Sequence, residues 1–172
     1  MLDERDDVRG NNEAGETIGL NEARREAALL FHTPAKKPQL INPVVLAYVG
    51  DGVFELMVRQ YLVSLPNHKS HHLHREATKL VSAKAQRKLL ERWQPLLTEE
   101  EADIVRRGRN TKSGAPPKNA DPADYRQATA LECLVGYLYY EGRIARLQEL
   151  FAVVTAVDDH GEQIAEAQEA QE

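Results

Sequence analysis

Three acidic residues stand out because they lie in segments that are otherwise apolar. Asp51 and Glu55 interrupt the apolar stretch from Val44 to Leu65, and Glu132 interrupts the stretch "ATALECLVGYLYY". An unpaired carboxylate is costly inside a core, so a core helix that carries one needs a compensating interaction. Each stretch also contains glycine, which costs a helix interior about 0.5–1 kcal/mol relative to alanine.

The combination of acids and glycines predicts a metal site between two helices. Gly50 and Gly52 flank Asp51, and Gly136 lies one turn after Glu132. Because small residues let helix backbones approach closely, we expect the two helices to cross and bring these two acids together. A divalent cation would remove the cost of placing two carboxylates side by side.

Glu55 is a further candidate ligand, because it lies four residues after Asp51 and therefore on the same helix face. Ligands that are all oxygen atoms favour Mg²⁺, with Mn²⁺ as a substitute, over zinc. The alternative interpretation is that these acids pair with arginines such as Arg59 or Arg126, because structural ion pairs are common.

The elements that must position these acids are predicted to be helical. Asn42 and Pro43 have the character of an N-cap and a first-turn proline, and they predict a helix that runs to about Leu65. Apolar residues at helical spacing predict one further helix over residues 72–94, which ends before Pro95.

The second half of the chain also gives helical signals. Thr98 and Glu101 have the spacing of a capping box, and Gly108 is placed to end that helix. Residues 109–120 are a loop by composition, and Asp121 begins the next helix after it. The last predicted helix covers residues 143–157. No segment alternates apolar and polar residues with a period of two, so we predict an all-α fold class.

The net charge of −5 is unevenly distributed along the 172 residues. Residues 1–37 are polar, and residues 158–172 carry six acids and no base, so we expect both ends to be disordered. Residues 38–157 form the single predicted domain and carry 16 basic and 13 acidic residues, a net charge of +3. A basic body favours a polyanionic partner.

The cellular compartment is indicated by two features. Cys133 is the single cysteine, which excludes an internal disulfide and suits the reducing cytoplasm. The long apolar stretch contains three charged residues, which makes it a core helix rather than a membrane span. We therefore expect a cytoplasmic protein without a membrane-spanning segment.

Four segments resemble a known family. "LAYVGDGVFEL" and "TALECLVGYLYYEG" resemble the two acidic motifs of ribonuclease III, and "LHREATKLVSAKAQ" and "RRGRNTKSGAPPKNADPADYRQATALE" are similar to segments of its compact Mini-III type. The resemblance covers roughly residues 42–155, with the motifs in order. It implies the all-helical endonuclease domain, which acts on double-stranded RNA as a homodimer and here lacks a separate double-stranded RNA-binding domain.

The resemblance also assigns roles to the acids. Asp51 falls on the family's metal-binding catalytic aspartate and Glu132 on its catalytic glutamate, while Glu55 matches a glutamate common in the Mini-III type. The implied chemistry is Mg²⁺-dependent attack of water on a phosphodiester, which leaves a 5′-phosphate and a 3′-hydroxyl. The implied substrate is the precursor of 23S ribosomal RNA.

The larger ribonuclease III enzymes carry additional acids where this chain has Val44, Ala47 and Thr129. These differences are shared by the Mini-III type, and they favour one metal with several waters over two tightly held metals. They also leave an alternative function, a non-catalytic RNA-binding or ribosome-associated protein with the same fold. The presence of Asp51 and Glu132 argues against that alternative.

A basic loop is the predicted RNA-binding segment. Arginines and lysines in a loop rich in glycine, proline and serine can follow a phosphate backbone, and asparagine or serine can reach 2′-hydroxyls. The candidate residues are Arg106, Arg107, Arg109, Asn110, Lys112, Ser113 and Lys118. The alternative is that the loop is merely a solvated connector.

Overall fold

The computed structural model describes residues 32–66, 69–112, 114, 116, 118 and 120–154. Every regular element in these residues is a helix, which confirms the predicted all-α class. Most of the predicted N-terminal extension, residues 1–31, and all of the predicted acidic tail lie outside the described residues.

The long apolar segment forms α2, Pro43–Ser64. The side chain of Asn42 accepts a hydrogen bond from the backbone N–H of Val44 at 2.9 Å, which confirms the predicted N-cap. Leu65 is extended and ends the helix. Among the described residues, no helix combines the length and the apolar character that crossing a membrane requires.

The prediction of a single helix over residues 72–94 is wrong. The structure has α3, Ser70–Val81, and α4, Ala83–Trp93. Between them Ser82 has a ψ of 147°, and its hydroxyl accepts a hydrogen bond from the N–H of Ala85 at 3.3 Å. The apolar spacing continues across this break, so the sequence pattern conceals it.

The capping box of α5, Glu99–Asn110, is confirmed, because both of its hydrogen bonds between Thr98 and Glu101 are present. The prediction that Gly108 ends this helix is wrong. Gly108 is buried where α5 packs on α6, and a Cβ there would lie 2.8 Å from the Cβ of Cys133. The glycine therefore serves helix packing rather than helix termination.

The central helix is α6, Pro122–Tyr140, which Asp121 caps as predicted by accepting two backbone hydrogen bonds. After α6 the backbone of Gly142 has a φ of 68°, a left-handed conformation that favours glycine. This turn reverses the chain into a further helical segment at residues 144–154. The two short 3-10 helices are η1 (Pro38–Leu40) and η2 (Gln94–Leu96).

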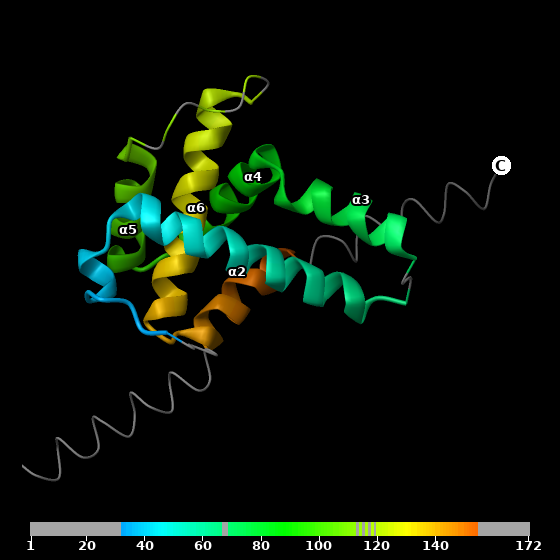
Figure 1. Cartoon of the computed structure of the whole chain (residues 1–172), viewed down its shortest axis with the longest axis horizontal. Coiled ribbons are helices and arrows are strands. Elements are labelled where there is room, and N and C mark those ends of the chain that lie inside the picture. Colours follow the sequence, from blue (N-terminus) through cyan, green and yellow to red (C-terminus); the bar gives the residue numbers. More distant parts are fainter. Residues whose placement is uncertain are drawn as a thin grey trace, which may run out of the picture.

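Helix α6 runs through the middle of the molecule, with α5 and α4 on either side and α2 crossing it (Figure 1). The apolar side chains of α6 from Ala130 to Leu138 are buried, and they form one core cluster with residues of α2, α4, α5 and the segment 144–154. Two long helices that pack on each other can be held at a defined separation, which is the condition for a site built from both.

Candidate active site

The crossing of α2 and α6 is a contact between main chains. A Cβ on Gly50 would lie 1.8 Å from the carbonyl oxygen of Glu132, and a Cβ on Gly136 would lie 2.0 Å from the carbonyl oxygen of Leu46. Only glycine fits at either position, as the sequence pattern predicts. A Cβ on Gly52 would meet no atom of another described residue within 4 Å beyond its own helix backbone, so Gly52 takes no part in the crossing.

The crossing brings two of the predicted site residues together, one from each helix. Burial raises the pKa of Glu132 to about 7, and the nearby negative charge of Asp51 adds to the increase. The pKa of Asp51 is also raised, first by burial and then by the charge of Glu55. Ionisation of either acid is therefore opposed by its surroundings.

Neither acid has a basic partner. In the residues that the structure describes, Asp51 and Glu132 form no ion pair with a lysine or arginine, so the alternative of arginine pairing is wrong for these two. Glu55 differs, because its carboxylate pairs with Arg59 at 2.7 Å on the surface of α2. Within the same described ranges, no cluster of three histidine, cysteine or acidic side chains is arranged to bind a metal.

The chemistry of this donor set fits a hard divalent cation. Asp51 and Glu132 would supply oxygen ligands from two helices, and a bound cation would offset the burial and the repulsion that together raise the pKa of Glu132. Two protein carboxylates leave most coordination positions to water or substrate, which is typical of Mg²⁺.

Gln86 is a residue of this site that the sequence patterns did not reveal. It lies in the first turn of α4 and is only 2% exposed, and its Nε2 donates to the carbonyl oxygen of Val81 at 3.1 Å. The nearby amide partly opposes the rise in the pKa of Glu132 that burial and the charge of Asp51 produce. The sequence did not single out Gln86 because this residue lay in the interior of the single helix predicted over residues 72–94.

The arginines of the predicted RNA-binding segment already have partners within the protein. Arg106 pairs with Asp103, and Arg109 donates from Nε to Oε1 of Gln127 at 3.2 Å. Arg107 donates to the carbonyl oxygens of Gln39 and Ile41, at 3.0 and 3.4 Å, so it fixes the segment before α2.

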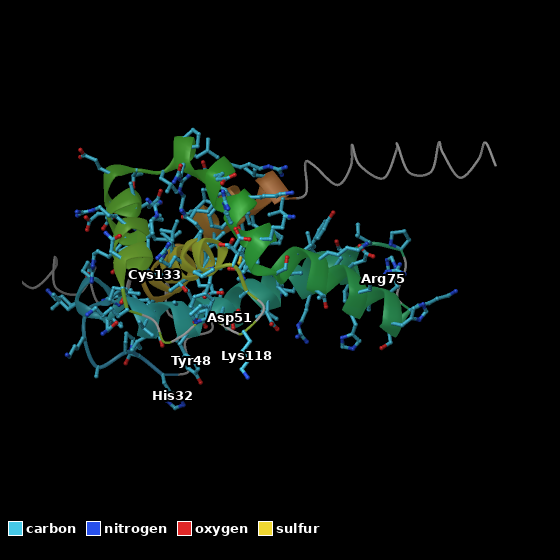
Figure 2. The ribbon with its side chains drawn as sticks, turned by 90° about the horizontal axis from the view of Figure 1, so that it is seen from above. His32, Tyr48, Asp51, Arg75, Lys118 and Cys133 are labelled. Carbon is cyan, nitrogen blue, oxygen red and sulfur yellow. The ribbon has the colours of Figure 1, made fainter. Side chains whose placement is uncertain are left out.

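Three further residues of that segment are exposed to solvent. Asn110, Lys112 and Lys118 are exposed, and Ser113 lies outside the described residues. Figure 2 shows Lys118 on the same side of the molecule as Asp51 and Tyr48. A ligand that contacts Asp51 from solvent therefore approaches a face that also carries a basic side chain.

Comparison with known proteins defines the class to which this fold and site belong. Residues 44–143 match the model of the Ribonuclease III domain, and this range contains both acids of the helix crossing. The chain belongs to the ribonuclease III family.

The chain is also similar to individual proteins, among them two that are named Mini-ribonuclease 3. The chain is 47% identical over 123 residues to Mini-ribonuclease 3 of Brevibacillus brevis, with 69% of this chain and 92% of the relative covered. It is 42% identical over 125 residues to Mini-ribonuclease 3 of Symbiobacterium thermophilum, with 73% and 96% covered. A crystal structure of a Fusobacterium nucleatum protein is 25% identical, with a TM-score of 0.65 and coverage of 72% of this chain and 99% of that chain.

Proposed function

We propose that this protein is an endoribonuclease that cleaves double-stranded RNA with the help of a bound divalent metal. The observation that carries the proposal is the pair of carboxylates, Asp51 and Glu132, which the helix crossing brings together with no basic partner among the described residues. Membership of the ribonuclease III family and similarity to proteins named Mini-ribonuclease 3 support the same activity.

Asp51 and Glu132 would hold Mg²⁺, for which Mn²⁺ can substitute. When bound, such a metal lowers the pKa of a coordinated water and stabilises the negative charge that develops on the phosphate. The two carboxylates would bind the metal and orient it. The contact between Gly50 and Gly136 fixes the separation of the helices that carry them. Hydrolysis in this way leaves a 5′-phosphate and a 3′-hydroxyl.

The proposed active form is a homodimer that uses the outer face of α2. Val45, Tyr48, Leu56 and Val63 are exposed on this helix, and Tyr48 is 81% exposed. Their spacing of three, four or seven residues, with Gly52 between them, puts them on one side of a helix with 3.6 residues per turn. A second copy of the same face would bury this apolar stripe, and the open space at Gly52 lets a partner approach closely.

The proposed RNA-binding surface is the segment from Arg106 to Lys118, in which Asn110, Lys112 and Lys118 are exposed to solvent. Lysines there can neutralise phosphates as an RNA duplex lies across the face that carries Asp51. The proposed natural substrate is the precursor of 23S ribosomal RNA, in the cytoplasm, which follows from the resemblance to the Mini-III type.

The deciding experiment is a cleavage assay on a long RNA duplex, with Mg²⁺ and with excess EDTA. We expect cleavage with the metal and none without it. Asp51→Asn keeps the shape of the side chain and removes the charge, so cleavage should fall by at least about a thousandfold, the order of loss seen when an electrostatic contact to the transition state is removed. Glu55→Gln is the matched control on the same helix and should retain activity.

The outcomes separate the possible functions. Duplex binding without cleavage in any metal would support the non-catalytic RNA-binding alternative. Cleavage by Asp51→Asn at the wild-type rate would overturn the assigned site.

A further inference from the structure

The outer side of α4 carries three basic residues whose charges are not compensated within the described structure. Lys84, Lys88 and Arg92 follow one another at intervals of four residues, so they lie along one side of the helix, and all three are exposed. In the part of the chain that the structure describes, none of them forms an ion pair, whereas Arg87 of the same helix pairs with Asp124. These three residues, the basic face of α4, are therefore open to an anionic partner.

A groove lies beside the basic face of α4, and the last described residue forms part of it. The groove has a volume of about 150 Å³, and Lys88 and Arg92 are its charged lining residues. Its apolar lining comes from α2, α3, α4 and the segment 144–154, with Phe54, Leu80, Ala85, Leu89 and Val154. The chain after Val154 therefore begins next to two unpaired cations.

The sequence after Val154 continues the pattern that this groove requires. The buried residues of the segment 144–154 recur at helical spacing and are Leu147, Leu150, Phe151 and Val154. The same spacing leads on to Val157 and Asp158, three and four residues after Val154. An apolar residue is thus available for the apolar lining of the groove, and an acid is available for its basic edge.

The charge and the length of the following segment are also complementary to the basic face of α4. Residues 158–172 carry six acids and no base. Lys84 and Arg92 lie about 12 Å apart along the helix axis, and the extended chain from Asp158 to Glu162 spans about 13 Å. The match to the Ribonuclease III domain ends at residue 143, so this acidic segment lies outside the family domain.

We propose that residues 157–172 dock on the basic face of α4 of the same chain, with Val157 over the groove and the acids against Lys84, Lys88 and Arg92. A segment tethered at Val154 acts at a high effective concentration, so weak ion pairs are sufficient to hold it. The docked segment is an internal polyanion that covers these cations.

Docking has a consequence for RNA binding, and this consequence rests on the proposed function. Arg87 pairs with Asp124 at 2.8 Å, so α4 lies beside the start of α6, where the proposed RNA-binding segment ends. A duplex on that segment is therefore attracted by the basic face of α4 as well. RNA and the acidic segment compete for the same cations.

The test places a nitroxide on the acidic segment and records which backbone amides it broadens in the NMR spectrum of the full ¹⁵N-labelled chain. Ala167→Cys supplies the attachment site. Burial raises the pKa of the Cys133 thiol to about 12, so the native cysteine stays unlabelled. We expect the nitroxide to broaden the amides of α4.

Charge-reversal variants of the labelled protein identify the contact. Lys88→Glu/Arg92→Glu should abolish the broadening, and adding Asp158→Lys/Asp159→Lys should restore it. All four positions are outside the buried core, and circular dichroism checks that each variant is folded.

The matched control is Lys36→Glu/Lys37→Glu, which makes the same change of charge on the segment before η1, across α6 from α4 (Figure 1). This control should retain the broadening. A loss as large as that in Lys88→Glu/Arg92→Glu would show a general effect of charge and contradict docking on α4.

A second measurement tests the competition. Duplex RNA in EDTA, which prevents metal-dependent cleavage, should relieve the broadening of α4. Asp158→Asn/Asp159→Asn should bind the duplex about two- to tenfold more tightly than wild type at low salt, and the gain should shrink as salt rises.

Each outcome decides one step. Absence of broadening at α4 contradicts docking. Broadening that arises only when nitroxide-labelled chains are mixed with separate ¹⁵N chains places the segment on a partner subunit and overturns docking within one chain. Broadening that saturating RNA leaves unchanged overturns the competition. Failure of the proposed function appears differently, as a wild type that does not cleave duplex RNA with Mg²⁺ while the broadening of α4 persists.

Discussion

Two glutamates of this protein lie against its core in opposite surroundings. Glu101, at the start of α5, is 1% exposed and receives hydrogen bonds from Nε and Nη2 of Arg146, both at 2.9 Å. Burial raises its pKa, but the bonds from Arg146 and from the N–H of Thr98 outweigh burial, and the net pKa is lowered. Glu132, in α6, has the carboxylate of Asp51 nearby instead of an arginine. Burial, and after it the charge of Asp51, raises its pKa to about 7.

The difference separates a structural carboxylate from a functional one. The charge of Glu101 is neutralised within the protein, so this residue holds the segment 144–154 against α5. The charge of Glu132 is not compensated by a basic residue of the described part, and in the proposed function a bound cation would compensate it. A buried acid therefore indicates a binding site when its neighbours disfavour its charge rather than compensate it.

The largest expected effect comes from breaking the helix crossing that creates this difference. In Gly50→Ala the new Cβ meets the carbonyl oxygen of Glu132, which is main chain and cannot rotate away. We expect a loss of about 3 kcal/mol or more in the free energy of unfolding, measured by urea denaturation, because overpacking against a backbone leaves little room to relax.

Gly52→Ala is the control on the same helix, because nothing lies within 4 Å of that position in the protomer. Its protomer should be no less stable than wild type, since alanine favours a helix over glycine. Equal losses in both variants would show that the crossing does not determine the result, because helix propensity favours alanine at both positions.

The next largest effect is expected from substitution of Glu101, the carboxylate that is paired within the protein. Glu101→Gln leaves the guanidinium of Arg146 without its buried charged partner, and we expect a loss of about 2–3 kcal/mol in unfolding free energy. Glu149 contacts the same guanidinium from the surface, so Glu149→Gln should cost less than about 0.5 kcal/mol. A cost for Glu101→Gln as small as that of Glu149→Gln would remove the contrast between the two glutamates.

The raised pKa of Glu132 should make the free energy of unfolding depend on pH in the absence of metal. The folded pKa of Glu132 is about 7 and its ordinary value is 4.5, so between these pH values the folded state binds more protons than the unfolded state. Its contribution to the unfolding free energy therefore falls as pH rises from about 4.5 to about 7, by on the order of 2 kcal/mol. Urea denaturation in EDTA at pH 5 and pH 8 measures this loss.

Glu132→Gln should remove that component of the pH dependence, and Asp51→Asn should move it to lower pH, because the charge of Asp51 is the second cause of the raised pKa. A wild type and a Glu132→Gln variant with identical pH profiles would contradict the assignment.

The smallest effect is expected at the third acid of the predicted site. Glu55 pairs with Arg59 at the surface of α2, and such exposed pairs contribute little. Glu55→Gln should change the unfolding free energy by less than about 0.5 kcal/mol and should leave the Mn²⁺ affinity of the free protein within about threefold of wild type. A larger loss of affinity would make Glu55 a ligand equal to Asp51 and Glu132.

The sequence predicted the parts of this structure that depend on local chemistry. The caps at Asn42 and Asp121 and the capping box of Thr98 and Glu101 follow from side-chain hydrogen bonds within one turn, and all three are present. The approach of Asp51 and Glu132 was also predictable, because a glycine beside an acid in an apolar helix is costly unless another backbone lies against it.

The remaining features depend on tertiary context. Gly108 resembles a helix stop in the sequence, but it is required where α5 packs against Cys133. The break at Ser82 and the burial of Gln86 depend on how α3 and α4 pack, which apolar spacing alone does not determine. The partners of Arg107 lie near residue 40, too far along the chain for a sequence pattern to connect them.

The contact at Gly50 and Gly136 also determines how this site can open. Because main-chain atoms of α2 and α6 touch there, no change of side-chain rotamer can separate the two helices. Backbone amides around the crossing should therefore exchange with deuterium only when the whole domain unfolds, as the most protected amides of a fold do. The two carboxylates are consequently kept or lost together with the fold, and fraying at the ends of either helix leaves their spacing unchanged.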